Sequence, residues 1–369
     1  MRWPQAPRVA LVKLGALGDV IYAFPIVSAL NAWRPEGRIT WIIEERWREL
    51  PSLHPAVHDV VAVDTKAWRR AIRSGRWGDA WRGVRDFARS VAGRFDLVLD
   101  AQGLYKSGMA AWLTRSPVRI GFAPEDCRER GSARLCTRHA PPAGPVHVVQ
   151  RNLGLLSVLG ATPKEPQFDI RPASTDEAWA SGWLAGVGIG PGDRVIALHP
   201  GAGHPAKKWG LERFASLARH LLPRTAGRVA FVTGPEDRAA LDRVVEGLTP
   251  RVVIASPPTV GALAALLRRC LVVIAGDTGP LHLAAALGRP TVALYGPSDP
   301  VTAAPVGTGH RVLKHPCPCG WVPGPYFNRR CPDTPCMAAI GIDEVVEAVG
   351  SILASGDPNV DAGRLVKET

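Results

Sequence analysis

Two glycine turns in this sequence follow apolar runs and lead into helix-like segments. The turn KLGALGD at residues 13–19 ends in the carboxylate of Asp19, whereas the turn GDTG lies at residues 276–279. Such a turn can hold a phosphate on the backbone N–H groups of the helix that follows it. Because a carboxylate would repel a phosphate, we interpret Asp19 as a general base for an acceptor hydroxyl.

The turn at 276–279 gives the stronger phosphate signal. Asp277, Thr278 and Gly279 stand at the end of an apolar strand, and His282 lies one helical turn further on. We predict that the N–H groups of this turn hold a diphosphate and that His282 donates a hydrogen bond to the leaving phosphate. The structural alternative treats Asp277 as a helix cap and His282 as a core residue. The order of strand, cap, glycine and histidine favours the site.

Two further strand ends in the second half carry candidate donor-binding residues. Lys207 lies in GAGHPAKKWG, where small residues allow close approach and the lysine supplies charge, although such a lysine is often only part of a solvated loop. Glu236 follows the next strand and is placed to accept bonds from ribose hydroxyls. An acidic residue there is equally a favourable first-turn charge, which on its own is the preferred interpretation.

In the first half, the segment DAQGLYKS at 100–107 again places polar groups at the end of an apolar strand. We predict that Gln102 and Lys106 bind the acceptor in the cleft that Asp19 faces. One half of the chain would then hold an activated donor and the other half an acceptor, with a base between them. This arrangement is typical of a transferase.

These residues are positioned by two series of alternating strands and helices. Apolar runs at 8–14, 38–43, 59–63 and 96–100 predict buried strands, with helices at 21–33, 79–93 and 146–159 and a long irregular loop at 121–145. A second alternation runs from 194 to 296. The pattern predicts an α/β protein with two Rossmann-like, doubly wound domains. We place them at 1–170 and 171–354, with a frayed tail at 355–369.

Composition limits the classes of function. The chain has 369 residues, 46% of them hydrophobic, and a formal net charge of +12, which favours acidic partners. No apolar run approaches the ~18 residues that a membrane-spanning helix needs, and the first residues read as neither a signal nor a transit peptide. We therefore expect a cytoplasmic protein.

Taken together, five segments make a family resemblance recognisable: residues 12–30, 42–61, 96–108, 198–210 and 276–300. In order and spacing they resemble the ADP-heptose:lipopolysaccharide heptosyltransferases of glycosyltransferase family 9, over roughly residues 8 to 350. The first half is more similar to heptosyltransferase I than to II. The resemblance implies a GT-B fold, an ADP-heptose donor and a lipopolysaccharide inner-core acceptor, Kdo-lipid A, at the inner face of the cytoplasmic membrane.

The resemblance also assigns roles to residues. It implies that Asp19 is the general base, that Lys207 and Glu236 bind the donor, and that Asp277, Thr278, Gly279 and His282 form the donor set. It implies an acceptor-binding role for four basic residues, which would pair with lipid A phosphates and Kdo carboxylates: Lys66, Arg69, Arg70 and Arg128. More than half of the arginines in this part of the chain have the simpler interpretation of solvated surface.

The chain contains no Asp-x-Asp pair, the usual carboxylate site for a metal–diphosphate. We therefore expect inverting, metal-independent transfer without a cofactor, with the leaving group stabilised by dipoles and cations. Four cysteines lie near the end of the sequence: Cys317, Cys319, Cys331 and Cys336. They allow an alternative interpretation as a structural Zn²⁺ site, although their spacing is not that of a standard zinc ribbon.

The sequence leaves other classes of protein open. The alternative most similar to a heptosyltransferase is a family 9 transferase that uses another nucleotide sugar or another glycan acceptor. A nucleotide-sugar epimerase or dehydrogenase would need a third glycine in the first turn and a ribose-binding acid about 20 residues further on. A non-catalytic carbohydrate-binding protein would have no need of a carboxylate at Asp19. We expect no nucleic-acid partner.

Overall fold

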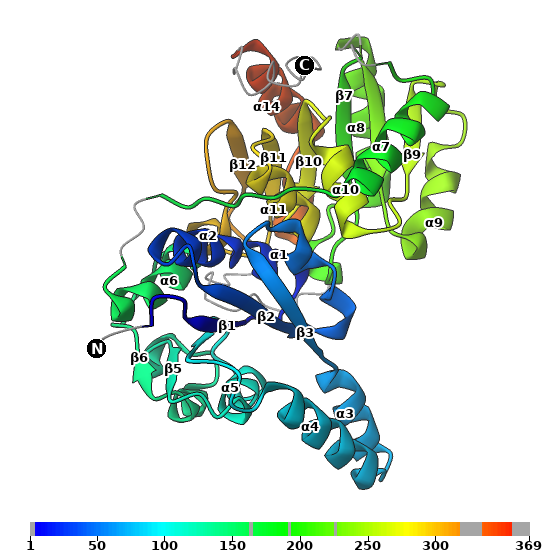
Figure 1. Cartoon of the computed structure of the whole chain (residues 1–369). Helices are drawn as coiled ribbons and strands as arrows, with labels where there is room; N and C mark the ends of the chain where they lie inside the picture. Colours follow the sequence, from blue (N-terminus) through cyan, green and yellow to red (C-terminus); the bar gives the residue numbers. More distant parts are fainter. Residues whose placement is uncertain (1–3, 162–164, 191–192, 225–226, 318–333, 356–369) are drawn as a thin grey trace, which may run out of the picture. The chain divides into compact units, whose positions relative to one another are not determined.

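The computed structural model describes residues 4–161, 165–190, 193–224, 227–317 and 334–355 (Figure 1). Its contacts divide the chain into two compact units, Met1–Arg171 and Pro172–Thr369. Each unit contains one six-stranded parallel sheet with helices in its crossover connections.

The first unit has the strand order β3-β2-β1-β4-β5-β6. Its strands are β1 (Arg8–Val12), β2 (Arg38–Glu44), β3 (Val57–Val63), β4 (Leu97–Asp100), β5 (Val118–Gly121) and β6 (Arg138–His139). Its helices are α1 (Leu17–Ile21), α2 (Phe24–Trp33), α3 (Thr65–Arg73), α4 (Trp77–Val91), α5 (Tyr105–Leu113) and α6 (Val148–Gly154). The order in which successive strands are added to the sheet reverses between β1 and β4. This switch point is the usual place for a ligand in this topology.

The second unit repeats this order as β12-β11-β10-β7-β8-β9. Its strands are β7 (Val195–His199), β8 (Arg228–Val232), β9 (Val252–Ala255), β10 (Val272–Gly276), β11 (Thr291–Tyr295) and β12 (His310–Lys314). Its helices are α7 (Ser174–Gly186), α8 (Leu211–Leu221), α9 (Pro235–Val245), α10 (Val260–Leu267), α11 (Gly279–Ala286), α12 (Pro300–Ala303), α13 (Pro335–Ala338) and α14 (Ile342–Ala354). Its switch point lies between β7 and β10.

The apolar runs form the central strands because these strands are covered on both faces. Four successive residues of β1 and every residue of β4 and β10 are buried. In the first unit the core packs the sheet against α4 and α5, and in the second against α8 and α14. Continuous burial removes the alternation expected of a half-exposed strand, so these strands appear as unbroken Val, Ile and Leu runs.

Some local predictions need correction. The single helix expected at 21–33 is broken into α1 and α2. The segment 121–145 is not wholly irregular, because it contains two 3-10 helices and β6, which pairs with β5. Helix α7 is capped at Ala173, whose N–H donates to Asp176 at 3.2 Å.

Candidate functional site

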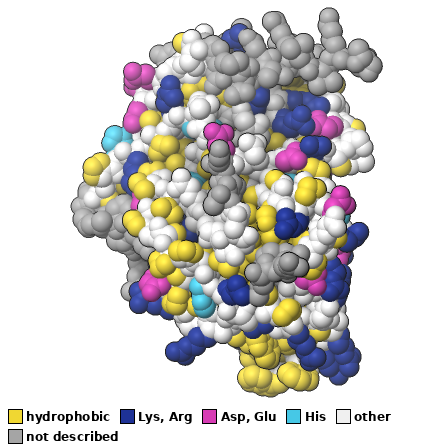
Figure 2. All heavy atoms as spheres, turned by 60° about the vertical axis from the view of Figure 1, so that its left-hand side comes forward, with side chains coloured by type: hydrophobic (Ala, Val, Ile, Leu, Met, Phe, Trp, Pro, Cys, Tyr) yellow, Lys and Arg dark blue, Asp and Glu magenta, His cyan; other side chains and the backbone are white. Residues whose placement is uncertain are grey.

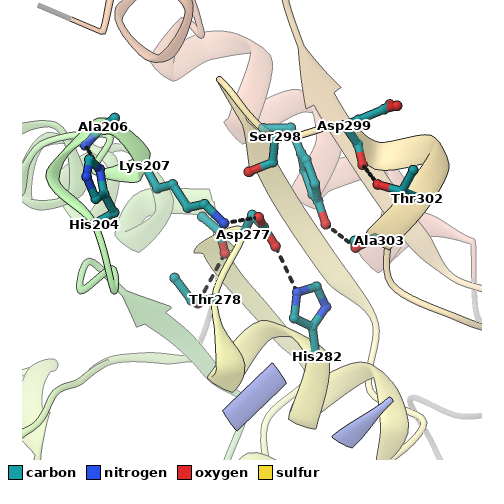
Figure 3. A network of polar contacts seen from close by, with 12 residues as sticks. His204, Ala206, Lys207, Asp277, Thr278, His282, Ser298, Asp299, Thr302 and Ala303 are labelled. Carbon is teal, nitrogen blue, oxygen red and sulfur yellow. Dashed lines mark hydrogen bonds and ion pairs between the residues drawn. The ribbon is translucent and has the colours of Figure 1, made fainter. Parts of the chain in front are cut away.

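In the second unit, three of the predicted donor-binding residues form one hydrogen-bonded network (Figure 3). The Nζ atom of Lys207, in the loop after β7, lies 2.5 Å from Oδ2 of Asp277, which follows β10. The other carboxylate oxygen of Asp277 accepts from Nε2 of His282 at 2.9 Å. Because β7 and β10 are the strands at the switch point, the network lies where this fold binds ligands.

Burial and charge set the state of Asp277. Burial raises the pKa of this carboxyl group, but the hydrogen bond and charge of His282 and the Lys207 ammonium outweigh it, so the pKa is held well below its usual range. Asp277 is thus a fixed anion, and its side chain is 11% exposed. Its two carboxylate oxygens hold the Lys207 ammonium and the His282 imidazole in place, and these two side chains are only 19% and 4% exposed.

The start of α11 lies beside this network. Thr278 is the N-cap residue, and its hydroxyl donates to the carbonyl of Gly276 at 3.1 Å. Among the residues that the structure describes, no side chain caps this helix. The positive end of α11 therefore lies next to the residue that binds the Lys207 ammonium, a setting that favours an anion.

Two neighbours of the network were not predicted from the sequence. Lys314, at the end of β12, donates from Nζ to the carbonyl of Ser298 at 2.7 Å. The Ser298 hydroxyl is buried, and within the described residues it has no hydrogen-bond partner. Figure 3 places Ser298 on the loop that faces Asp277. A buried hydroxyl of this kind is suited to a ligand oxygen, and the segment GPSDP after β11 was the sequence signal available.

Glu236 lies outside the network. It is exposed in the first turn of α9, which fits the helix-charge interpretation. The next residue, Asp237, lies 3.7 Å from the Lys208 ammonium, and its charge acts on the partly buried imidazole of His199. The structure therefore brings together Lys207, Asp277 and His282, but not Glu236.

In the first unit, the loop after β1 presents Asp19 at the surface, in the first turn of α1. Gln102 connects this loop to the loop after β4, because its Oε1 accepts from the backbone N–H of Leu14 at 2.6 Å. A Cβ atom on Gly15 would lie 2.6 Å from the Gln102 amide and 3.0 Å from an Asp19 carboxylate oxygen. A side chain at position 15 would therefore push the Gln102 amide and the Asp19 carboxylate away from their positions.

A buried lysine supports the same loop. Lys13 is 4% exposed, and its Nζ donates to the carbonyl of Ala101 at 2.7 Å. Burial lowers the pKa of Lys13, while the charges of Asp19 and Asp100 act in the opposite direction. Asp100 is also buried, and burial raises its pKa to about 6, although it accepts hydrogen bonds from Gln102, Gly103 and Ser107. No local pattern in the sequence predicts that the side chain of Lys13 is buried.

The predicted acceptor residues only partly converge. The Lys106 ammonium lies 3.8 Å from Oε1 of Glu44, a buried carboxylate at the end of β2 that also accepts from Thr65. Burial lowers the pKa of Lys106, Glu44 raises it, and the charges of Arg69 and Lys66 lower it further. The charges of Lys66 and Arg69, together with Arg46, thus act on Lys106, and we call Lys66, Arg69 and Lys106 the cationic group. Glu44, which the Lys106 ammonium approaches, was not selected by the sequence analysis.

Arg70 and Arg128 are both exposed. Arg70 lies on α3 but is not among the charges that act on Lys106. Arg128 lies in a loop whose next residue, Glu129, accepts from the Tyr105 N–H at 2.5 Å, so this loop packs at the start of α5.

The predicted cysteine site is only partly covered. Cys319 and Cys331 lie outside the described residues, and of the remaining pair Cys336 is buried. In the ranges that are described, no group of three or more His, Cys, Asp or Glu side chains is placed to hold a metal ion.

Glycosyltransferases with the GT-B fold typically have two sheets of Rossmann order in one chain. This chain has both sheets, with a cation and a helix start at one switch point and a carboxylate at the other. The model of glycosyltransferase family 9 (heptosyltransferase) matches residues 84–320. A lipopolysaccharide heptosyltransferase 1 of Pseudomonas aeruginosa PAO1 is 30% identical over 329 residues, which cover 88% of this chain and 87% of that relative. The chain belongs to glycosyltransferase family 9.

Solved structures agree on the fold. A family 9 glycosyl transferase from Veillonella parvula has a TM-score of 0.81 at 23% identity and covers 96% of this chain and 99% of its own. The Escherichia coli heptosyltransferase WaaC with ADP has a TM-score of 0.76 at 24% identity, over 94% and 99%. The GT-B fold predicted from the sequence is confirmed.

None of the helices that the structure describes is both long enough and apolar enough to cross a lipid bilayer.

Proposed function

We propose that this enzyme transfers a heptose from ADP-heptose to the Kdo-lipid A inner core of lipopolysaccharide, with inversion and without a metal ion. The observation that carries the proposal is the network of Lys207, Asp277 and His282 beside the start of α11. It offers fixed cationic and N–H groups to a diphosphate. The names of the relatives support the choice of sugar and acceptor, since they include lipopolysaccharide heptosyltransferase 1 of P. aeruginosa and WaaC with ADP.

In the proposed reaction, the acceptor hydroxyl attacks the anomeric carbon of the heptose. A new C–O bond forms on the face opposite the diphosphate, and the bond between that carbon and the phosphate oxygen breaks with its electron pair leaving on ADP. Lys207 and the α11 start stabilise the charge that develops on ADP, and His282 donates a hydrogen bond to it. Because Asp277 holds Lys207 and His282 before substrate arrives, little reorganisation is needed.

Asp19 takes the proton of the acceptor hydroxyl. It is suited to this because it is exposed and because Gln102 and Gly15 fix the loop that carries it. The cationic group of Lys66, Arg69 and Lys106 binds anionic groups of the acceptor, with Gln102, Arg70 and Arg128 as further acceptor contacts. The acceptor places the enzyme at the inner face of the cytoplasmic membrane.

A donor screen tests the proposal. Purified enzyme with Kdo-lipid A is given ADP-heptose, ADP-glucose or a UDP-hexose, and the glycosylated product is measured by mass spectrometry. We expect turnover with ADP-heptose to exceed turnover with the other donors by at least tenfold. Equal or greater turnover with another nucleotide sugar would instead support a family 9 transferase of different specificity.

Metal independence has its own test. Extensive EDTA treatment is expected to leave the rate unchanged, because protein cations supply the charge stabilisation that a metal would otherwise provide. A rate that falls on chelation and returns with Mg²⁺ would contradict this part of the mechanism.

A further inference from the structure

The helical hairpin of α3 and α4 carries an unusual share of the charge of the chain. Between Thr65 and Val91 the sequence has eight basic and two acidic residues, so this hairpin supplies half of the net charge of +12. Asp64 caps α3 by accepting from the Ala67 N–H at 2.7 Å. Trp68 packs its ring against Phe87, with ring centroids 6.0 Å apart. The two helices are therefore joined by defined contacts.

Two tryptophans of this hairpin are exposed and are not part of its packing. Trp77 and Trp81 are 66% and 68% exposed. They lie four residues apart on α4, so they share one side of the helix, whereas Phe87 and Val91 are buried against the sheet. Figure 2 shows a group of hydrophobic side chains at the lower end of the molecule, at the level where Figure 1 draws α3 and α4. Lys and Arg side chains lie beside them.

The charges around these tryptophans are mostly positive even after ion pairing. Asp79 lies within 3.6 Å of both Arg76 and Arg82, so one carboxylate is shared by two guanidinium groups. Asp86 is shared in the same way by Arg85 and Arg89. Each acidic residue therefore leaves one positive charge over. On α3, no carboxylate within the described residues forms an ion pair with Arg69, Arg70 or Arg73, three further basic residues of the hairpin.

We propose that this hairpin docks on an anionic lipid bilayer, with Trp77 and Trp81 in the headgroup region and the surrounding arginines against lipid phosphates. Exposed indole rings beside arginines are the composition of segments that lie in a membrane interface. A second copy of the chain is a poor occupant, because two hairpins of net positive charge repel each other. The proposal rests on the proposed function, since a lipid-linked acceptor is what brings the enzyme to a membrane.

Vesicle sedimentation tests the docking surface directly. The full-length enzyme is mixed with vesicles of phosphatidylethanolamine and phosphatidylglycerol, or with neutral phosphatidylcholine vesicles. We expect binding to the anionic vesicles only, and expect it to weaken at high salt. The Trp77→Ala/Trp81→Ala variant should bind at least about tenfold more weakly. Arg82→Gln/Arg89→Gln should lose about fivefold for each charge removed.

The second unit offers a matched control. Trp179 and Trp183 are also four residues apart on one helix, α7, but their rings stack on each other at 6.4 Å. Trp179→Ala/Trp183→Ala should bind vesicles as the unchanged enzyme does. Trp77→Phe/Trp81→Phe keeps apolar rings and should retain most binding, and thermal unfolding checks that each variant is folded. If the two alanine variants bind alike, the proposal is overturned.

A soluble acceptor separates docking from catalysis. With a deacylated, water-soluble acceptor, Trp77→Ala/Trp81→Ala should retain the kcat/KM of the unchanged enzyme. Loss of activity on that substrate would place the tryptophans in the catalytic unit and overturn the docking proposal. Loss of a dimer in this variant, seen by light scattering, would identify the face as a self-interface and also overturn it. An enzyme that binds anionic vesicles but transfers no heptose would contradict the proposed function while leaving the docking surface intact.

Discussion

The two switch points of this protein have the same topology but opposite chemistry. Between β1 and β4 an exposed carboxylate, Asp19, is supported by the buried cation of Lys13. Between β7 and β10 a cation, Lys207, is held by the largely buried carboxylate of Asp277. One sheet therefore presents an anion and the other a cation, although both have the order 3-2-1-4-5-6. The comparison teaches that the residues placed at the strand ends, and not the fold, decide which substrate each half can bind.

The largest expected effect comes from removing the presented anion. Asp19→Asn should lower kcat by about 10²–10⁴-fold, because the amide cannot take the acceptor proton, while the KM for the donor should change little. Initial rates of ADP release measure this. Asp59→Asn, which changes another exposed aspartate of the first unit, serves as the control. Near-full activity of Asp19→Asn would point to another base or to a carbohydrate-binding protein.

Removing the presented cation should have the next largest effect. Lys207→Met should lower kcat/KM for ADP-heptose by about 10²–10³-fold, the loss typical of one oriented charge-stabilising donor. The neighbouring Lys208 is a matched control, because its side chain is 45% exposed and pairs only loosely with Asp237 at 3.7 Å. Lys208→Met should change kcat/KM by less than about threefold. Similar losses in both variants would show that positive charge in general, and not the position of Lys207 in the network, stabilises the leaving ADP.

The buried groups behind the two sites predict a pH effect on stability. Asp100 has a pKa of about 6 in the folded protein against 3.8 as the ordinary value, so the folded state binds more protons between these values. Stability is then lost as the pH rises through this window, by about 3 kcal/mol in total. Asp100→Asn has no such cost, so relative to the unchanged protein it should gain about 3 kcal/mol between pH 4 and pH 7.

Urea unfolding at both pH values measures this difference. Asp96 provides a control of opposite sign, because the hydrogen bond from Arg8 lowers the pKa of that carboxyl group. Its contribution to stability is present above the ordinary value of 3.8 and is lost as the pH falls below it, so the stability difference of Asp96→Asn should change little between pH 4 and pH 7 and should shrink only at lower pH. A difference for Asp100→Asn that does not change with pH would contradict the burial argument.

The smallest expected effect concerns the cationic group of the first unit. Arg69→Gln should raise the KM for the acceptor by about tenfold, the effect of one charge-assisted contact, with the KM for donor unchanged. Arg70→Gln, one residue further along α3, should have a smaller effect because Arg70 is not among the charges acting on Lys106. Steady-state kinetics with each substrate varied in turn measures both. An equal rise in the two KM values would contradict an acceptor role.

Much of the fold could be predicted because its central strands are buried on both faces. The apolar runs identified β1, β4, β7 and β10 without any knowledge of their partners. The strands missed were the weak ones: β5 contains Arg119, β6 has only two residues, and β12 is partly exposed along its length. Whether such a segment forms a strand depends on its pairing with a more apolar neighbouring strand. This pairing is tertiary information that the local sequence does not contain.

The site could be predicted only where a local motif marks a strand end. Asp277 and His282 lie five residues apart, and their contact follows from one helical turn. Lys13 with Ala101, and Glu44 with Lys106, meet across 88 and 62 residues of sequence, and no local pattern relates them. The acidic residue at the end of β2 was visible in the sequence, but its partner was not.

The most direct test of the division between the two switch points is calorimetric binding of ADP, without an acceptor. We predict that Asp19→Asn binds ADP with the affinity of the unchanged enzyme, whereas Lys207→Met binds it at least about tenfold more weakly. The opposite result, with ADP binding lost in Asp19→Asn and kept in Lys207→Met, would place the nucleotide in the first unit and contradict the assignment of both sites.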